Sequence, residues 1–473
     1  MRKAFMGVRL RRLREEKGLT QAALAKALSL SPSYLNQLEK NQRPLTLPIL
    51  LKINSVFGTD VQLFSEDEEA RLIAELRDVL SETTSFGEVA LAEIRELVTG
   101  MPAVARSYIA LHRRYREAAE RVDALTSGLS RDDTTIPSPV LTPFEEVRDF
   151  FYARRNYVDA LDRAAERIFK QCDGVIGEMG PVLVAYLKSK HGIDVVSERA
   201  EAGAVALQRQ FEADDRVLRI SANLRPGQQA FQLATQLAFL ECGKVIESLT
   251  SKAAFGNQET RGLARIGLAN YFAGALVLPY SAFLSAAESL RYDIDQLGRR
   301  FGVGFETVCH RLSTLQRPQA RGVPFFFVRV DRAGNMSKRQ SATDFHFSRV
   351  GGTCPLWNVY EAFANPGRIL VQLAEMPDGR TYLCVARTVT RGQGGFGTPN
   401  KTFAIALGCD LRHAERLVYA KGLNLKSADA RTPIGVGCKV CERTACPQRA
   451  FPAIGRPLAI NEDSNRFAPY SIA

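Results

Sequence analysis

The spacing of apolar and polar residues changes several times along the chain. Residues 1–64 carry short apolar repeats at helical spacing, broken by brief turns, and residues 66–127 carry longer, highly charged helical repeats. Residues 128–143 are rich in Ser, Thr, Pro and Asp, which is typical of an exposed linker. Residues 144–320 return to mainly helical spacing. The pattern predicts a mainly α chain of several domains.

The last third of the chain differs from the rest. Aromatic and β-branched residues at 323–330 and 380–389 predict strands there. We therefore expect an α+β fold in this C-terminal part.

One apolar stripe in the second region has a coiled-coil spacing. Its members recur at alternating intervals of three and four residues, as in a short seam between two helices. The stripe suits a helix that forms a dimer, and it equally suits a helix that faces its own core. The members are Tyr108, Leu111, Tyr115, Ala118, Val122 and Leu125.

The strongest local signals lie in residues 9–45. Gly18 suits the left-handed end of a first helix, and Thr20 can cap a second helix. Ser31 followed by Pro32 is a strong start signal for a third helix. The first fifty residues also hold ten Lys or Arg against three acids, or +7 of the formal +12 of the whole chain. Positive charge of this density suits a polyanion such as DNA.

Over about residues 7–63 the chain closely resembles the helix-turn-helix of the phage-repressor (XRE) family. The resemblance implies that the third helix lies in the major groove with its N-terminal half at the base edges, and that two copies bind paired half-sites. A helical hairpin used for protein contact is the alternative. The matching residues are Thr20-Gln21, Leu24-Ala25, Ser31, Tyr34-Leu35, Leu38-Glu39 and Arg43-Pro44.

Two sets of residues are expected to contact DNA. Gln37 can pair bidentately with adenine, and Ser33 can donate or accept a hydrogen bond. The full base-reading set is Ser31, Pro32, Ser33, Tyr34, Asn36 and Gln37. The set expected at phosphates, which position the protein without specifying sequence, is Gln21, Lys40, Asn41 and Arg43.

Residues of roughly 150–290 resemble the ImmA/IrrE metallopeptidase family, through segments 226–241, 269–273 and 276–279. In that family a helix carries an H-E-x-x-H zinc motif. Zinc hydrolysis needs two imidazoles one turn apart and a carboxylate base. The five motif positions here read Thr235, Gln236, Leu237, Ala238 and Phe239. We therefore expect no protease activity, and a fold retained as a ligand pocket.

Nearly the whole chain resembles regulators of short-chain acyl-CoA metabolism, which control propionate and glyoxylate-type pathways. Segments 150–159, 351–357 and 433–446 carry this likeness. The resemblance implies that a short acyl-CoA is the ligand. Such a site needs cations for the phosphates and an aromatic surface for adenine, although core aromatics and solvated arginines explain the same residues equally well. The candidates are Arg154, Arg155, Tyr157, Arg225, Phe231 and Tyr271.

Six of the nine cysteines lie after residue 350. Cys438, Cys441 and Cys446 have a C-x₂-C-x₄-C spacing, and a fourth ligand would come from Cys409 or Cys354. Four thiolates can hold a zinc ion or an iron–sulfur cluster, and free or redox-paired thiols are a third interpretation. The proline after the last thiol favours iron–sulfur, and the resemblance implies a [4Fe-4S] cluster.

Together these features predict a DNA-binding transcriptional regulator that responds to a short-chain acyl-CoA and acts as a homo-oligomer, a dimer or larger. No apolar run is long enough to span a bilayer, so we expect a cytoplasmic protein with reduced cysteines. The alternatives are an iron–sulfur redox or iron sensor, and a regulated metallopeptidase fused to a DNA-binding domain. Four parts are expected: a five-helix DNA-binding domain (1–65), a helical dimerisation or linker region (66–140), a degenerate ImmA/IrrE-like ligand domain (141–320) and a cysteine-rich α+β domain (321–473).

Overall fold

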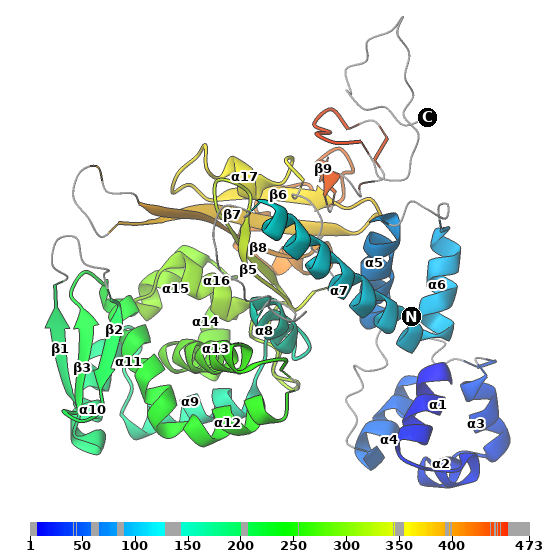
Figure 1. Ribbon diagram of the computed structural model, residues 1–473, viewed down its shortest axis with the longest axis horizontal. Helices are drawn as coiled ribbons and strands as arrows, with labels where there is room; N and C mark the ends of the chain where they lie inside the picture. The colour runs from blue at the N-terminus through cyan, green and yellow to red at the C-terminus, as the bar shows by residue number, and fades with distance from the viewer. Residues whose placement is uncertain are drawn as a thin grey trace, which may run out of the picture.

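The computed structural model is mainly helical, with a large sheet in its last third (Figure 1). The expected mainly α fold with an α+β C-terminal part is therefore confirmed. The described residues are 7–40, 42–43, 45–57, 66–82, 89–127, 143–199, 207–253, 255–343, 345, 354–392, 397, 400–435, 437–438, 441, 443–444 and 446–452.

The N-terminal domain has a small core of its own, in which Leu24, Leu35 and Leu38 are buried. Its described residues form four helices rather than the expected five. The next helix, α5, packs with α6 and α7 instead, because its apolar face is used there. The four helices are α1 (Gly7–Glu16), α2 (Gln21–Ala27), α3 (Pro32–Glu39) and α4 (Leu47–Phe57).

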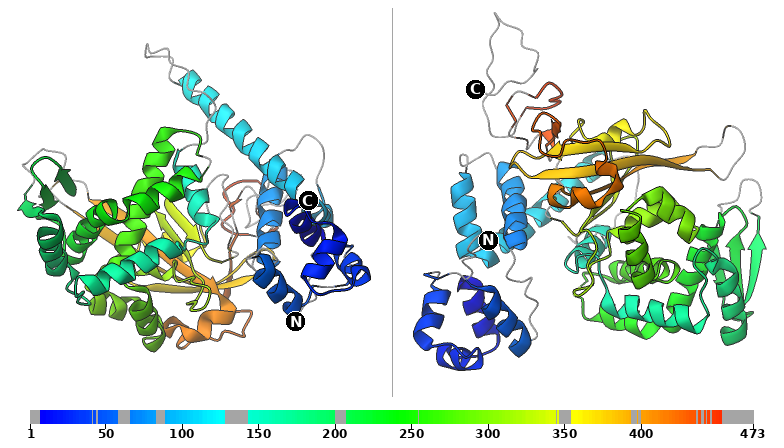
Figure 2. Two further views of the ribbon diagram at one scale, coloured as in Figure 1. Left: turned by 90° about the horizontal axis from the view of Figure 1, so that it is seen from below. Right: turned by 180° about the vertical axis from the view of Figure 1, so that it is seen from behind.

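A three-helix block follows the N-terminal domain. Leu72 and Leu76 of α5 meet Ile94 and Val98 of α6 in a second small core. The 26-residue α7 runs away from the N-terminal domain (Figure 2). The expected linker at 128–143 lies almost wholly outside the described residues. The three helices are α5 (Glu66–Glu82), α6 (Leu91–Gly100) and α7 (Pro102–Ser127).

The middle of the chain is a helical domain built around α13, which packs against α8, α9 and α11. Among the described residues no single helix is long and apolar enough to cross a membrane, and the apolar pair α13 and α14 is bent by 61°. The helices are α8 (Pro143–Tyr152), α9 (Asp159–Gln171), α10 (Met179–His191), α11 (Pro226–Glu241), α12 (Gly243–Ser251), α13 (Gln258–Val277), α14 (Tyr280–Ser289), α15 (Ile294–Phe301) and α16 (Phe305–Leu312).

Two sheets complete the fold. A small one, ordered β1-β3-β2, lies at the end of the helical domain beside α10 and α11 (Figure 1). The larger one is ordered β5-β4-β8-β7-β6-β9, and all its pairs are antiparallel except β6 with β9. The strands predicted from the sequence fall on β4 and β7. The strands are β1 (Asp194–Glu198), β2 (Arg209–Glu212), β3 (Val217–Ser221), β4 (Phe326–Val330), β5 (Met336–Ser341), β6 (Leu370–Glu375), β7 (Thr381–Arg391), β8 (Lys401–Asp410) and β9 (Arg431–Pro433).

The larger sheet is buried on both faces, because successive side chains of a strand point to opposite sides. Leu383 and Val385 face the core of the helical domain, whereas Tyr382 and Cys384 face a second core beneath the short helix α17 (Asn358–Glu361). One continuous core thus spans the boundary expected at residue 320. The four-part division of the chain remains a prediction.

Candidate functional site

The starts of α2 and α3 are each capped by a hydrogen bond between near neighbours in sequence. Thr20 Oγ1 accepts a hydrogen bond from the backbone N of Ala23, and Ser31 Oγ accepts one from the backbone N of Tyr34, both at 3.2 Å. Gly18 has a φ of 64°, which is the left-handed conformation expected of it. The helix boundaries predicted from these residues are therefore confirmed.

The N-terminal half of α3 faces solvent while its other side packs inward. Leu35 and Leu38 are fully buried and join α3 to the domain core. Ser31, Pro32 and Ser33 are exposed. The remaining base-reading candidates, half-buried in this unbound chain, are Tyr34, Asn36 and Gln37.

The residues expected at phosphates are placed differently from one another. Lys40 and Arg43 are exposed, and the Arg43 guanidinium lies 5.6 Å from the centre of the Tyr34 ring. Asn41 lies outside the described residues. Gln21 instead donates to Glu39 Oε2 at 3.0 Å. This hydrogen bond holds the Gln21 side chain against Glu39 within the domain.

Glu39 is the centre of a buried polar network between the helices. Its side chain is only 1% exposed, and Arg14 Nε donates to Glu39 Oε1 at 2.7 Å. The hydrogen bond to Glu39 raises the pKa of Arg14. Gln21 Nε2 reaches Asn36 Oδ1 at 3.4 Å as well. The network joins α1, α2 and α3, so the orientation of α3 depends on it.

The motif positions of the peptidase-like helix hold no metal ligands. Thr235 Oγ1 donates to the backbone O of Phe231 at 2.8 Å, within its own helix. Gln236 Oε1 accepts from Arg209 Nη1 at 3.1 Å, and the Arg209 guanidinium lies 5.5 Å from the centre of the Phe239 ring. Burial lowers the pKa of Arg209. An arginine from β2 therefore contacts two of the five motif positions, and no sequence signal predicted it.

The residues expected to bind acyl-CoA are mostly engaged in internal contacts. Arg154 donates to the backbone O of Phe150 at 2.9 Å, and its guanidinium lies 3.8 Å from the centre of the Phe150 ring. The Tyr157 hydroxyl accepts from Arg317 Nε at 3.1 Å. Arg225 is exposed at the start of α11, and Phe231 is half-buried on the same helix.

Tyr271 lies in the core of the helical domain. Its hydroxyl donates to Asp162 Oδ2 and accepts from the backbone N of Val158 at 3.0 Å. Arg311 Nη2 donates to Asp162 Oδ1 at 2.6 Å, and both side chains of this pair are almost fully buried. Burial and the nearby Asp162 carboxylate raise the pKa of Tyr271 well above its ordinary value. A ligand could reach this ring only if the core opened.

Helix α8 connects the three-helix block with the helical domain. Arg113 Nη1 of α7 donates to Asp149 Oδ2 of α8 at 2.6 Å. The Arg71 guanidinium of α5 lies 3.8 Å from the centre of the Tyr152 ring of α8. Because α8 also packs against α13, this one helix contacts both the helical domain and the three-helix block.

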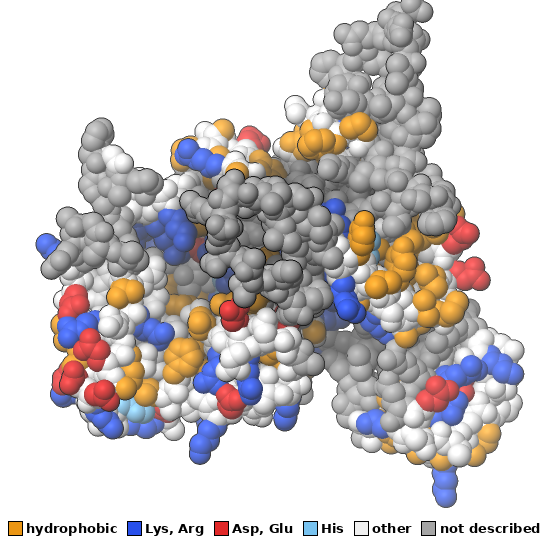
Figure 3. Space-filling view, in the orientation of Figure 1, with side chains coloured by type: hydrophobic (Ala, Val, Ile, Leu, Met, Phe, Trp, Pro, Cys, Tyr) orange, Lys and Arg blue, Asp and Glu red, His pale blue; other side chains and the backbone are white. Residues whose placement is uncertain are grey.

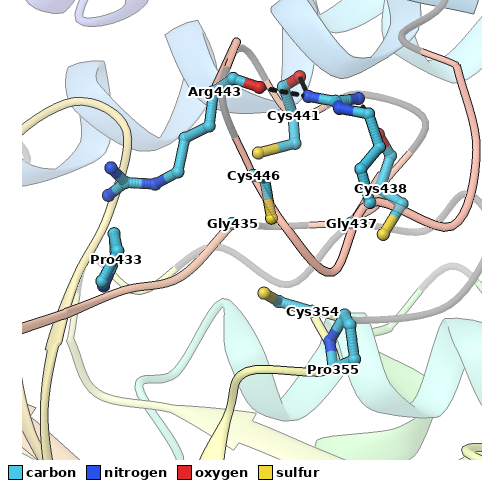
Figure 4. Close-up of a pocket in the computed structure, with 10 residues that line it drawn as sticks. Cys354, Pro355, Pro433, Gly435, Gly437, Cys438, Cys441, Arg443 and Cys446 are labelled. Carbon is cyan, nitrogen blue, oxygen red and sulfur yellow. Dashed lines mark hydrogen bonds between the residues drawn. The ribbon is translucent and has the colours of Figure 1, made fainter. Parts of the chain in front are cut away.

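Four cysteines line one pocket that is partly open to solvent. Cys354 enters from the loop before α17, and Cys438, Cys441 and Cys446 come from the segment after β9 (Figure 4). A Cβ at Gly435 would come within 2.6 Å of Cys441 Sγ, so only glycine leaves room for this thiol. Among the described residues no three His, Cys, Asp or Glu side chains are arranged to hold a metal ion.

The alternative fourth cysteine, Cys409, does not line this pocket. It lies in β8 opposite Leu383 of β7, and its side chain is buried in the core shared with the helices. Strand alternation fixes that direction, because the side chain cannot leave this face without a shift of register. The expectation of Cys409 in the thiol set is thus corrected in favour of Cys354.

Two arginines hold the backbone of the cysteine-bearing segment. Arg449 is 3% exposed and donates to the backbone O of Cys438 at 3.1 Å and of Cys441 at 2.9 Å. Arg443 donates to the backbone O of Ile434 at 3.1 Å. Burial raises the pKa of Cys441, and the two arginines oppose that rise. The spacing of the cysteines gave no signal of this support, because the arginines bind carbonyl groups rather than thiols.

Three family models match successive parts of the chain. One described as a helix-turn-helix matches residues 10–64. One described as an IrrE N-terminal-like domain matches residues 188–313. One described as the C-terminal part of a short-chain fatty acyl coenzyme A regulator matches residues 314–470. The three likenesses inferred from sequence motifs are therefore confirmed.

Curated relatives match over almost their whole length. The HTH-type transcriptional regulator PrpR of Mycobacterium tuberculosis is 52% identical over 99% of this chain and 96% of its own. RamB of the same organism, also an HTH-type transcriptional regulator, is 51% identical over 100% of this chain and 99% of its own. The propionyl-CoA carboxylase regulator of Cereibacter sphaeroides is 43% identical over 99% of each chain. A solved Mycobacterium tuberculosis transcriptional regulator is 55% identical, with a TM-score of 0.68 over 70% of this chain and 100% of that one.

Proposed function

Because the chain belongs to the family of helix-turn-helix regulators of short-chain acyl-CoA metabolism that includes PrpR and RamB, we propose that α3 reads an operator and that a short-chain acyl-CoA sets the operator affinity. The observation that carries this proposal is the exposed start of α3, where Ser31 caps the helix and Ser31, Pro32 and Ser33 face solvent. Such a helix end can enter the major groove without rearrangement. The protein would act on chromosomal DNA in the cytoplasm.

Base reading is assigned to Ser33 and Gln37, and phosphate contacts to Lys40 and Arg43. A bidentate pair contributes about 1–3 kcal/mol of discrimination, which is about 5- to 150-fold in affinity. A Ser33→Ala/Gln37→Ala variant should lose that preference while binding unrelated DNA as before. A Lys40→Ala/Arg43→Ala variant should weaken both kinds of binding and reduce the salt dependence.

Fluorescence anisotropy with promoter and scrambled duplexes, at a fixed salt concentration, measures both effects. Lys26→Ala is the matched control, because Lys26 is exposed at the end of α2. Undiminished promoter preference in the Ser33→Ala/Gln37→Ala variant would contradict the assignment.

The effector is assigned to the helical domain, with α8 as the element that transmits its binding. The support is the pair of contacts that α8 makes with the three-helix block, Arg113 to Asp149 and Arg71 over Tyr152. A ligand that binds one placement of α8 better than another must shift that placement. The exposed Arg225 and the half-buried Arg155 are the candidates for the acyl-CoA phosphates.

Operator affinity measured with and without acetyl-CoA, propionyl-CoA and free CoA tests the effector. Asp149→Ala should still bind the acyl-CoA in calorimetry, but the acyl-CoA should no longer change its operator affinity. In Glu145→Ala, on the same helix, the acyl-CoA should still change the operator affinity. Equal operator affinity with every acyl-CoA would remove the effector proposal and leave the DNA-reading proposal intact.

We also propose that the cysteine pocket holds a [4Fe-4S] cluster through Cys354, Cys438, Cys441 and Cys446. The support for this proposal is the donor set, because four thiols from two separate segments line one pocket, and Arg443 and Arg449 lie beside it to offset thiolate charge. When bound, such a cluster would link these segments and make their association depend on iron and oxidants. Zinc is the alternative occupant.

Anaerobically prepared protein separates these occupants by iron, sulfide and zinc analysis together with native mass spectrometry. Cys354→Ala should lower the iron content, whereas Cys409→Ala should leave it unchanged. A colourless protein with stoichiometric zinc would exclude the cluster. Operator affinity that followed oxidation but no acyl-CoA would favour an iron or redox sensor.

We further propose that the peptidase-like domain has no hydrolytic activity. Thr235, Gln236 and Phe239 provide no imidazole pair and no carboxylate base for zinc chemistry. Casein hydrolysis or self-cleavage that depended on added zinc would contradict this.

A further inference from the structure

Helix α7 has two apolar faces, and only one of them is covered. Ala105 and Ile109 are buried in the core that α7 shares with α5 and α6. On the other face Val104 is 51% exposed, Leu111 is 61% exposed and Tyr115 is 68% exposed. The block of α5, α6 and α7 also carries a visible gathering of hydrophobic side chains (Figure 3).

The exposed face has the spacing of a coiled-coil seam. Met101, which is 56% exposed, Val104, Tyr108, Leu111 and Tyr115 follow one another at intervals of three, four, three and four residues. The sequence continues this alternation through Ala118, Val122 and Leu125 to the end of the helix. The structure divides the stripe between the two interpretations. Tyr108 is half-buried and packs against the core of α5, α6 and α7, whereas Leu111 and Tyr115 are exposed and do not face the core of their own chain.

We propose that this face pairs with α7 of a second copy of the chain in a parallel, two-stranded coiled coil. The heptad alternation gives a helix a seam that fits another helix of the same repeat. The charge at one flanking position favours the parallel direction. In an antiparallel pair centred on the stripe, Arg114 would lie opposite the partner's Arg114, and like charges there repel. In a parallel pair Arg114 lies beside position 119, an alanine in the sequence.

The parallel arrangement also suits the rest of the molecule. Helix α7 begins near the N-terminal domain and runs away from it (Figure 2). A parallel pair therefore brings both N-terminal domains to the same end of the coil, where two half-sites of one operator can be bound together. Only the use of the dimer to bind two half-sites rests on the proposed DNA-binding function. The pairing of the two α7 helices does not.

Sedimentation equilibrium of the full chain without DNA tests the seam. The unmodified protein should be a dimer at micromolar concentration, and Leu111→Glu/Tyr115→Glu should raise the dimer dissociation constant at least 100-fold. Ala103→Glu/Ala110→Glu is the matched control, because it adds the same charges at exposed positions of α7 outside the stripe. Circular dichroism checks that all three proteins are equally helical.

Disulfide formation tests the direction of the pair. In a parallel coil each Leu111 faces the same residue of the second chain, so Leu111→Cys should give a covalent dimer on mild oxidation. Ala110→Cys should give far less.

A monomeric unmodified protein, or a Leu111→Glu/Tyr115→Glu variant that stays dimeric, would overturn the proposal. Covalent dimers formed equally by Leu111→Cys and Ala110→Cys would overturn the parallel seam. A dimer that bound no operator would instead refute the DNA-reading function and leave the seam standing.

Discussion

Replacing Tyr271 by phenylalanine separates a structural role from a ligand-binding role for this residue. The substitution removes one oxygen and keeps the ring. In the structure that oxygen donates to the buried Asp162 carboxylate and accepts from the backbone N of Val158. We expect Tyr271→Phe to destabilise the helical domain without changing its affinity for acyl-CoA.

The magnitude follows from the two hydrogen bonds. A hydrogen bond to a charged group is worth about 1.5–3 kcal/mol, and an N–H left buried without an acceptor costs about 1–3 kcal/mol. The two effects overlap at one site, so we expect a loss of about 3 kcal/mol. At 1.36 kcal/mol per factor of ten, this corresponds to roughly 100-fold faster exchange of amides that open with the domain. Arg311 continues to pair with Asp162, which keeps the loss below that of an isolated buried charge.

Hydrogen exchange followed by mass spectrometry gives the amide exchange rates of peptides from α9 and α13. Calorimetry gives the acyl-CoA affinity. Tyr186→Phe is the control. Its hydroxyl accepts from Lys190 and also bonds Glu241, and these two side chains pair with each other without it. Its removal should therefore change exchange in α9 and α13 only slightly. Unchanged exchange in Tyr271→Phe, together with a tenfold loss of acyl-CoA affinity, would refute the reasoning and place Tyr271 at the ligand.

Three further outcomes are expected. Glu39→Gln should weaken the Arg14 network at α3 by about 2 kcal/mol, seen as roughly 30-fold faster amide exchange in α2 and α3, and unchanged exchange would argue against the network. Burial lowers the pKa of Lys338 to about 8. Between pH 8 and the ordinary lysine pKa, the unfolded chain therefore binds one more proton at this residue than the folded chain does. The free energy of unfolding rises with pH over that range. Lys338→Met should therefore be more stable than the unmodified protein in urea at pH 7.5, and this advantage should shrink at pH 9.5; an equal difference at both pH values would contradict the assignment. Arg449→Met should release the carbonyl groups of Cys438 and Cys441 and lower the iron bound per chain, and full iron content would show that the loop holds without it.

The sequence by itself determined the features that depend on near neighbours in the chain. The caps at Thr20 and Ser31 act over three residues. The start of α2 and the start of α3 could therefore be predicted from the residues at those positions, without knowledge of the rest of the fold. The missing imidazoles at Thr235 and Phe239 are equally local, because a zinc motif within one helix is either present or absent in the sequence.

Only the tertiary structure decided which side chains distant segments bring together. Asp162 and Arg311 are 149 positions apart in the chain, and their pairing assigns Tyr271 to the core. Cys354 reaches the thiol pocket, while strand alternation buries Cys409 elsewhere. The stripe on α7 has one spacing whether it faces its own core or a second chain. Spacing records which residues share a face, whereas burial depends on what packs against that face.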